Sequence, residues 1–177
     1  MRLVVGVLTT LVAVGAPARA ATQAGLDYAS LSLRGVDTMQ VLVSASPLRS
    51  GEEVDTSEVR TSVELALRQL GITVLPPTGY VSGFGHFGVV GVDVSALEII
   101  PHGAGVEGYA FCVSVNVTQG VRLIRPDSIE TFAVTWESRK AVDLVDPGRP
   151  LTSGVLDEVR GEVSELANAW LAANRKR

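Results

Sequence analysis

The most regular pattern in the chain is an alternation of apolar and polar side chains over residues 109–123. A period of two is typical of a β-strand with one buried and one solvated face, as in an antiparallel sheet covered on one side only. The odd positions carry Tyr109, Phe111, Val113, Val115, Val117, Val121 and Leu123, and the even ones carry Cys112, Ser114, Asn116, Thr118 and Arg122. The segment therefore predicts a long strand whose even-numbered face lies open.

Shorter segments with strand character flank this one. They are rich in Val, Ile, Thr and aromatic residues, are separated by Pro- and Gly-containing turns, and span residues 36–43, 72–75, 89–100 and 129–136. Residues 137–150 are charged and contain two prolines and a glycine, so a long loop is expected there.

Two segments have helical periodicity. Asp55 and Glu58 have the spacing of an N-cap and its capping box, and Gly71 follows where a left-handed C-cap is favoured. Thr152 or Ser153 is expected to cap the second helix, which runs out at Asn174. The apolar stripes are Val59, Val63, Leu67 and Leu70 in the first helix, and Val155, Val159, Val163, Leu166 and Trp170 in the second.

The element order is β-α-β-β-β-β-α, with one hydrophobic face per element. Two amphipathic helices packed on one face of a mainly antiparallel sheet of four to five strands bury all of these faces. The sequence thus predicts a single α+β domain over residues 36–177, preceded by a loosely ordered lead-in over residues 21–35.

The first 20 residues have the layout of a bacterial signal peptide. Arg2 provides the positive start, an apolar run follows, and Ala18-Arg19-Ala20 is a cleavage sequence before Ala21. The run is shorter than the roughly 20 residues that span a bilayer. No Cys stands at the cleavage site, so the predicted product is not a lipoprotein but a soluble periplasmic or secreted protein without an integral membrane segment.

The composition restricts the partners. Removal of residues 1–20 leaves 157 residues with 13 basic and 19 acidic side chains, a net charge of −6. This charge argues against nucleic acid or anionic lipid as the main partner. Cys112 is the only cysteine, so no internal disulfide forms and the core must supply the stability.

The sequence GFGHFG at residues 83–88 matches the glycine pattern of a dinucleotide-binding loop. That fingerprint must follow a strand and open a helix, whose N-terminus receives the pyrophosphate. Gly88 is followed by residues with strand periodicity, so a turn before a strand is favoured and no cofactor is expected. Phe84 and Phe87 remain available to close the edge of the core or to meet a partner.

The two histidines, His86 and His102, both fall in glycine-rich segments. A metal or hydrolytic site would need them to converge with a carboxylate such as Asp93, Glu98 or Glu107, and no tight ligand spacing is present. Cys112 could act as a nucleophile only with a histidine beside it, and no family signature surrounds it. The sequence therefore assigns no catalytic, cofactor-binding or metal-binding residue.

Three segments carry a resemblance to known proteins: VRTSVELALRQLGITV, ETFAVTW and VLDEVRGEVSELANAWLAANRKR. Together they resemble a group of exported bacterial α+β proteins. The layout is also similar to small periplasmic modules, such as the lipoprotein that plugs the lipopolysaccharide-assembly barrel and the amino-terminal domain of the Tol translocation protein. Both bind partners and are not enzymes, so the resemblance implies binding without catalysis.

The leading functional hypothesis is an exported binding or accessory protein of the bacterial envelope. It would contact another envelope protein, or itself, through the polar even-numbered face of strand 109–123 or through an open strand edge. The alternative is a small metal-dependent or hydrolytic enzyme that uses the loop histidines. Convergence of His86, His102 and Asp93 in one pocket would favour the enzyme.

Overall fold

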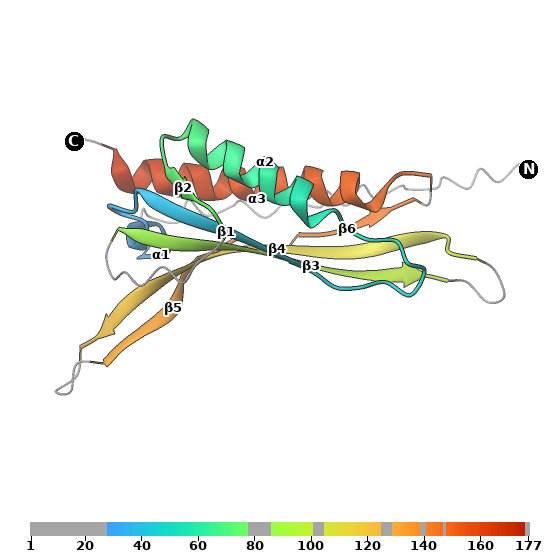
Figure 1. The fold of residues 1–177 in the computed structure, drawn as a ribbon, viewed down its shortest axis with the longest axis horizontal. Coiled ribbons are helices and arrows are strands. Elements are labelled where there is room, and N and C mark those ends of the chain that lie inside the picture. The colour runs from blue at the N-terminus through green and yellow to red at the C-terminus, as the bar shows by residue number, and fades with distance from the viewer. Residues whose placement is uncertain are drawn as a thin grey trace, which may run out of the picture.

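A computed structural model describes residues 28–77, 86–100, 105–124, 129–138, 141–146 and 148–175 (Figure 1). The predicted signal peptide and His102 lie outside these residues. The elements are α1 (Tyr28–Ser32), β1 (Thr38–Ala45), α2 (Thr56–Gln69), β2 (Thr73–Leu75), β3 (Phe87–Ile99), β4 (Gly108–Leu123), β5 (Ile129–Glu137), β6 (Ala141–Val145) and α3 (Leu151–Asn174). Within the described residues, no helix is long and apolar enough to cross a membrane.

The strands form one six-stranded sheet, and the predicted α+β class is confirmed. The strand order is β2-β1-β3-β4-β5, and β6 also pairs with β4. β1 runs parallel to β2 and to β3, whereas β4 is antiparallel to β3, β5 and β6. The strand β6 lies within residues 137–150, so the expectation of a loop throughout that segment was wrong. β6 forms because it pairs with β4 and buries Val145.

The core lies between one face of the sheet and the two long helices, which lie on the same side of it (Figure 1). The predicted odd face of β4 is confirmed, because Phe111, Val113, Val115 and Val117 are buried there. Both predicted helical stripes also reach the core, contributing Val59, Val63 and Leu67 from α2 and Val155, Val159, Val163 and Leu166 from α3. The hydrophobic effect of these side chains therefore holds the helices on a single face.

The two helix starts differ in how they are capped. The predicted cap of α2 is confirmed, because the Asp55 carboxylate accepts hydrogen bonds from the backbone N–H groups of Ser57 and Glu58. The predicted cap of α3 was wrong: the helix begins at Leu151 after Pro150, which has no capping side chain. The Thr152 hydroxyl instead accepts a hydrogen bond, 3.0 Å long, from the backbone N–H of Asp55. The hydroxyl thus joins the starts of the two helices.

The segment before β1, which we expected to be a loosely ordered lead-in, contains α1. Leu33 and Val36 beyond it are buried. The end of α3 fastens this segment: Trp170 Nε1 donates to the carbonyl of Val36 at 2.6 Å, and Asn174 Nδ2 donates to the carbonyl of Leu33 at 3.1 Å. These bonds join residues about 140 positions apart, a separation that periodicity does not reveal.

The hairpin of β4 and β5 projects from the body as a two-stranded arm (Figure 1). The register between the strands shifts at Val117 and Thr118, and Thr135 is the extra residue on β5. Its hydroxyl donates to the carbonyl of Val117 and accepts from Gln119 Nε2, and its carbonyl accepts from the Ser32 hydroxyl. A bulge bends its strand and increases the local twist, which accounts for the projecting arm.

Replacing two glycines of α3 by alanine should change the free energy of unfolding in opposite directions. A Cβ at Gly154 would overlap the Cγ2 methyl of Val145, whose side chain is buried and stiff. Gly154→Ala should therefore lower the free energy of unfolding by about 1–3 kcal/mol through overpacking. Gly161→Ala meets nothing within 4 Å and should raise it by up to about 1 kcal/mol through helix propensity. Urea unfolding monitored by circular dichroism tests both, and a reversed order would contradict the packing of α3 on β6.

The cap of α2 should make stability depend on pH. The pKa of Asp55 is lowered, first because its carboxylate accepts the backbone N–H of Glu58 and then because it bonds to Ser57. A lowered folded-state pKa stabilises the fold above the unfolded-state pKa, and this stabilisation is lost as the pH falls through the folded-state pKa. Asp55→Ala should lower the melting temperature at pH 7, and the difference should shrink toward pH 2.5. Asp55→Asn, which keeps the acceptor, should lose less at pH 7; an equal loss for both would contradict the cap.

Candidate functional site

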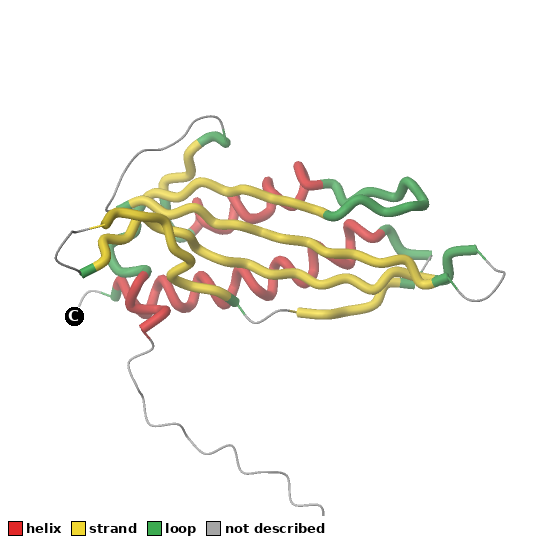
Figure 2. The backbone as a smooth tube through the Cα atoms, turned by 90° about the horizontal axis from the view of Figure 1, so that it is seen from below, coloured by secondary structure: helices red, strands yellow, loops and turns green. Residues whose placement is uncertain are grey.

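The face of the sheet opposite the two long helices is the candidate site, and we call it the open face. Figure 2 views the molecule from this side, with the strands in front of both long helices. The pairing registers place on it Leu42 and Ser44 of β1, Gly91, Asp93, Ser95, Leu97 and Ile99 of β3, Ala110, Cys112, Ser114, Asn116 and Thr118 of β4, Phe132, Val134 and Glu137 of β5, and Val142 and Leu144 of β6. The predicted even face of the long strand is therefore part of a wider surface.

The centre of the open face is a hydrogen-bonded polar network. The Asp93 carboxylate accepts from the Ser44 hydroxyl at 2.6 Å and from Asn116 Nδ2 at 3.2 Å. The Ser114 hydroxyl lies 3.4 Å from a carboxylate oxygen of Glu137. A Cβ at Gly91 would lie 2.8 Å from Asn116 Oδ1, so the absence of a side chain there lets the amide lie flat against the strand. The network orients two exposed carboxylates on β3 and β5.

One end of the open face is apolar. Leu97, Ala110 and Leu144 stand opposite one another across β3, β4 and β6, and Val142 lies in the adjacent row beside Cys112. The side chains of Leu97 and Val142 are each 73% exposed, and that of Leu144 is 65% exposed. We call Leu97, Ile99, Ala110, Val142 and Leu144 the apolar end of the open face.

The other end of the open face carries aromatic residues. Phe132 stands opposite Gly120 on the arm, and Val134 stands opposite Thr118. Continuing the register of β3 and β4 by one pair places Phe87 on the other side of Gly120. Phe87 is only 8% exposed but does not belong to the main core cluster, in keeping with its place on the opposite face of the sheet. The expectation that Phe87 closes an edge of the core is therefore not met, because its side chain is buried on the opposite face of the sheet; Phe84 lies outside the described residues.

The structure shows which element follows the GFGHFG segment, although residues 83–85 lie outside the described part of the chain. Gly88 is the second residue of β3, so the prediction that this glycine leads into a strand is confirmed. His86, just before the strand, is exposed, and its Nδ1 lies 2.7 Å from the carbonyl oxygen of Gly35. The carbonyl can only accept, so Nδ1 carries the proton of this hydrogen bond. The ring therefore has a structural role against the segment before β1.

The candidate catalytic or metal-binding residues do not gather at one place. His86 and Asp93 are seven positions apart along an extended chain, or roughly 23 Å at about 3.3 Å per residue. The Glu98 carboxylate accepts the backbone N–H of Ser50, and this bond lowers its pKa. Among the described residues no group of three or more His, Cys, Asp or Glu side chains is placed to hold a metal ion. Cys112 lies on β4 opposite Ser95 and Val142, on the open face as predicted.

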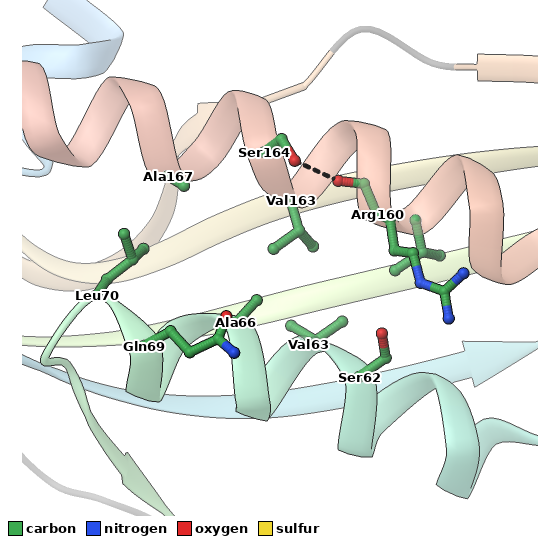
Figure 3. Close-up of a pocket in the computed structure, with 10 residues that line it drawn as sticks. Ser62, Val63, Ala66, Gln69, Leu70, Arg160, Val163, Ser164 and Ala167 are labelled. Atoms are coloured by element: carbon green, nitrogen blue, oxygen red, sulfur yellow. Dashed lines mark hydrogen bonds between the residues drawn. The ribbon is translucent and has the colours of Figure 1, made fainter.

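A shallow groove of about 250 Å³ runs between α2 and α3 on the helical side (Figure 3). Val63, Val159, Val163 and Leu70 line it together with small side chains, and Arg160 and Gln69 complete the lining. The Ser164 hydroxyl donates to the carbonyl of Arg160, an interaction within α3. Typical ligand pockets measure about 300–1,000 Å³ and contain convergent polar groups. This groove is smaller and lacks such convergence, so the open face remains the better candidate.

Comparison with known proteins adds little beyond this geometry. No protein-family model matches the chain, and no curated protein sequence matches it. Among solved structures, a dodecamer of a PelC variant from Paraburkholderia phytofirmans is similar with a TM-score of 0.38 and 12% identity, covering 81% of this chain and 91% of that one. A minor lipoprotein from Acinetobacter baumannii follows with a TM-score of 0.31 and 8% identity, covering 78% and 93%.

The rare lipoprotein B of Shewanella oneidensis is also similar, with a TM-score of 0.26, 15% identity, and coverage of 76% of this chain and 92% of that one. Two of these three neighbours are thus bacterial lipoproteins by name. The likeness is too weak to carry a functional argument, and none of their residues is transferred to this chain.

Proposed function

We propose that the chain is an exported binding or accessory protein of the bacterial envelope that docks another envelope protein on its open face. The observation that carries the proposal is the apolar end of the open face, where three large aliphatic side chains are about two-thirds exposed or more. The predicted signal peptide at residues 1–20 supports export to the periplasm or beyond.

The exposed aliphatic side chains lie outside the buried core. Leu97, Val142 and Leu144 point away from the helices, and the core is complete without them. Complete burial of one such side chain stabilises an assembly by roughly 1.5–3 kcal/mol. Contiguous exposed apolar patches of this kind mark interaction surfaces. A partner that covers this end would therefore gain several kcal/mol from it.

The charge of the open face favours a partner other than a second copy. Asp93 and Glu137 provide two carboxylates at its centre, and the Arg122 guanidinium on the arm is already paired with Glu130. Stacking two open faces centre to centre would bring like charges together, which is destabilising. A partner surface with apolar side chains around a basic group complements both features.

The alternative enzymatic function has less support. It required the histidines to meet a carboxylate, and His86 is instead hydrogen-bonded to Gly35, roughly 23 Å along the chain from Asp93 at about 3.3 Å per residue.

Substitutions on the two sides of the sheet test the proposed docking face. Leu97→Asp should release the protein from its envelope complex, because a charge at the apolar end cannot be buried against the partner. Leu65→Asp is the matched control, since Leu65 is 55% exposed on α2, on the helical side. Native gel electrophoresis of gently solubilised envelopes, probed for the protein, measures the complex.

The expected result is a large species for the parent and Leu65→Asp proteins and a monomer for Leu97→Asp. Parent protein that migrates as a monomer would contradict the proposal. A complex that contains only copies of this chain would contradict the choice of partner.

A further inference from the structure

A second surface, at the end of the molecule where α3 terminates, combines basic and apolar side chains. α1, the segment before β1 and the C-terminal end of α3 all lie at this end (Figures 1 and 2). They surround a cavity of about 660 Å³, lined by Leu31, Arg34 and Gly35 on one side and by Ala172, Asn174 and Arg175 on the other. We call this surface the basic end.

The fold builds the basic end from residues far apart in the sequence. Asn174 Oδ1 accepts the backbone N–H of Gly35 at 2.8 Å, and Asn174 Nδ2 donates to the carbonyl of Leu33. These two bonds hold the segment that carries Arg34 against the residue that precedes Arg175. A positive φ of 78° at Gly35 gives the backbone the turn that this contact requires. Arg34 and Arg175 therefore line the same cavity.

The basic end is positively charged in an otherwise acidic protein. Arg34 and Arg175 are exposed, and the next two residues in the sequence are Lys176 and Arg177. Among the described residues, the ion pairs are made by Arg68, Arg122, Arg149 and Arg160, and none of them involves Arg34 or Arg175. Both guanidinium groups are thus available to an anionic ligand.

Apolar side chains accompany these charges. Tyr28 and Leu31 are three positions apart on α1 and so share one side of it, and they are 81% and 38% exposed. Leu171, in the last turn of α3, is also exposed. Basic residues pair with lipid phosphates, while aromatic and aliphatic groups enter the boundary between headgroups and acyl chains. A soluble anion would gain nothing from these apolar groups, so they favour a lipid surface.

We propose that the basic end binds the surface of an anionic lipid bilayer. The total charge of −6 expected after signal-peptide removal does not prevent this, because charges more than about 8 Å apart are largely screened at physiological ionic strength. Asp37 is the acidic residue closest to Arg34 in the sequence, and Arg34 and Arg175 are the basic residues that line the cavity. The inference concerns a separate surface and does not rest on the proposed docking face.

Vesicle co-sedimentation tests the proposal with the processed chain recovered from the envelope, its first residue verified by mass spectrometry. The chain should bind vesicles of phosphatidylcholine with 30% phosphatidylglycerol and not vesicles of phosphatidylcholine alone. About 1 kcal/mol per basic group near the membrane corresponds to a loss of roughly fivefold in affinity per charge removed. Arg34→Gln should therefore weaken binding about fivefold, Arg34→Glu should weaken it more, and Tyr28→Ala should also weaken it.

The matched control is Arg149→Glu, which makes the same change in charge just before the other end of α3. It should change binding less than twofold. Thermal unfolding shows whether each variant folds. If Arg34→Glu does not fold, the binding of Arg34→Gln tests the proposal in its place. Equal binding to both kinds of vesicle, or equal losses for the variants at positions 34 and 149, would overturn the proposal. Displacement by inorganic phosphate, but not by sodium chloride of the same ionic strength, would assign the site to free phosphate instead.

Discussion

The pairing of β4 determines both what the molecule buries and what it exposes. This one strand pairs with β3, β5 and β6, and no other described strand has three partners. Because side chains alternate along a strand, the register that buries Phe111, Val113 and Val115 under the helices also turns Cys112 and Ser114 to the opposite side. A slip of one residue would exchange the two faces, so burial of the core specifies the chemistry of the open face.

Local periodicity predicted the helices and strands whose own residues show a clear apolar pattern or a capping residue. Both long helices have apolar stripes, and Asp55 caps α2 through bonds to residues two and three positions away, so these features can be read from neighbouring residues. α1 and β6 have no such signal. α1 is five residues long and is followed by a segment that α3 holds in place, and β6 is a five-residue strand that depends on β4. Likewise, the Thr152 hydroxyl bonds to a residue 97 positions earlier, which a local capping rule cannot detect.

The two candidate surfaces likewise combine residues that local periodicity predicts with residues that only the three-dimensional structure brings together. Alternation along β4 alone predicted Ser114 and Asn116 in the polar centre of the open face, whereas Ser44, Asp93 and Glu137 come from three other strands. The apolar end combines residues of three strands whose neighbourhood only the register reveals. At the basic end, side-chain bonds of Asn174 to Gly35 and Leu33 place Arg34 and Arg175 around one cavity. The two proposed binding surfaces thus lie at one end and along one face of the molecule, and among the described residues no three His, Cys, Asp or Glu side chains are placed to hold a metal ion.

Whether a partner covers the open face in the cell can be measured directly at Cys112, because it is the only cysteine and lies on that face. The measurement is the rate at which N-ethylmaleimide modifies Cys112 in intact envelopes, compared with the rate in the purified folded protein, both followed by intact-mass spectrometry. A covered open face predicts modification of the purified protein and strong protection in envelopes, with protection lost in the Leu97→Asp variant. Equal rates in envelopes and in the purified protein would contradict it.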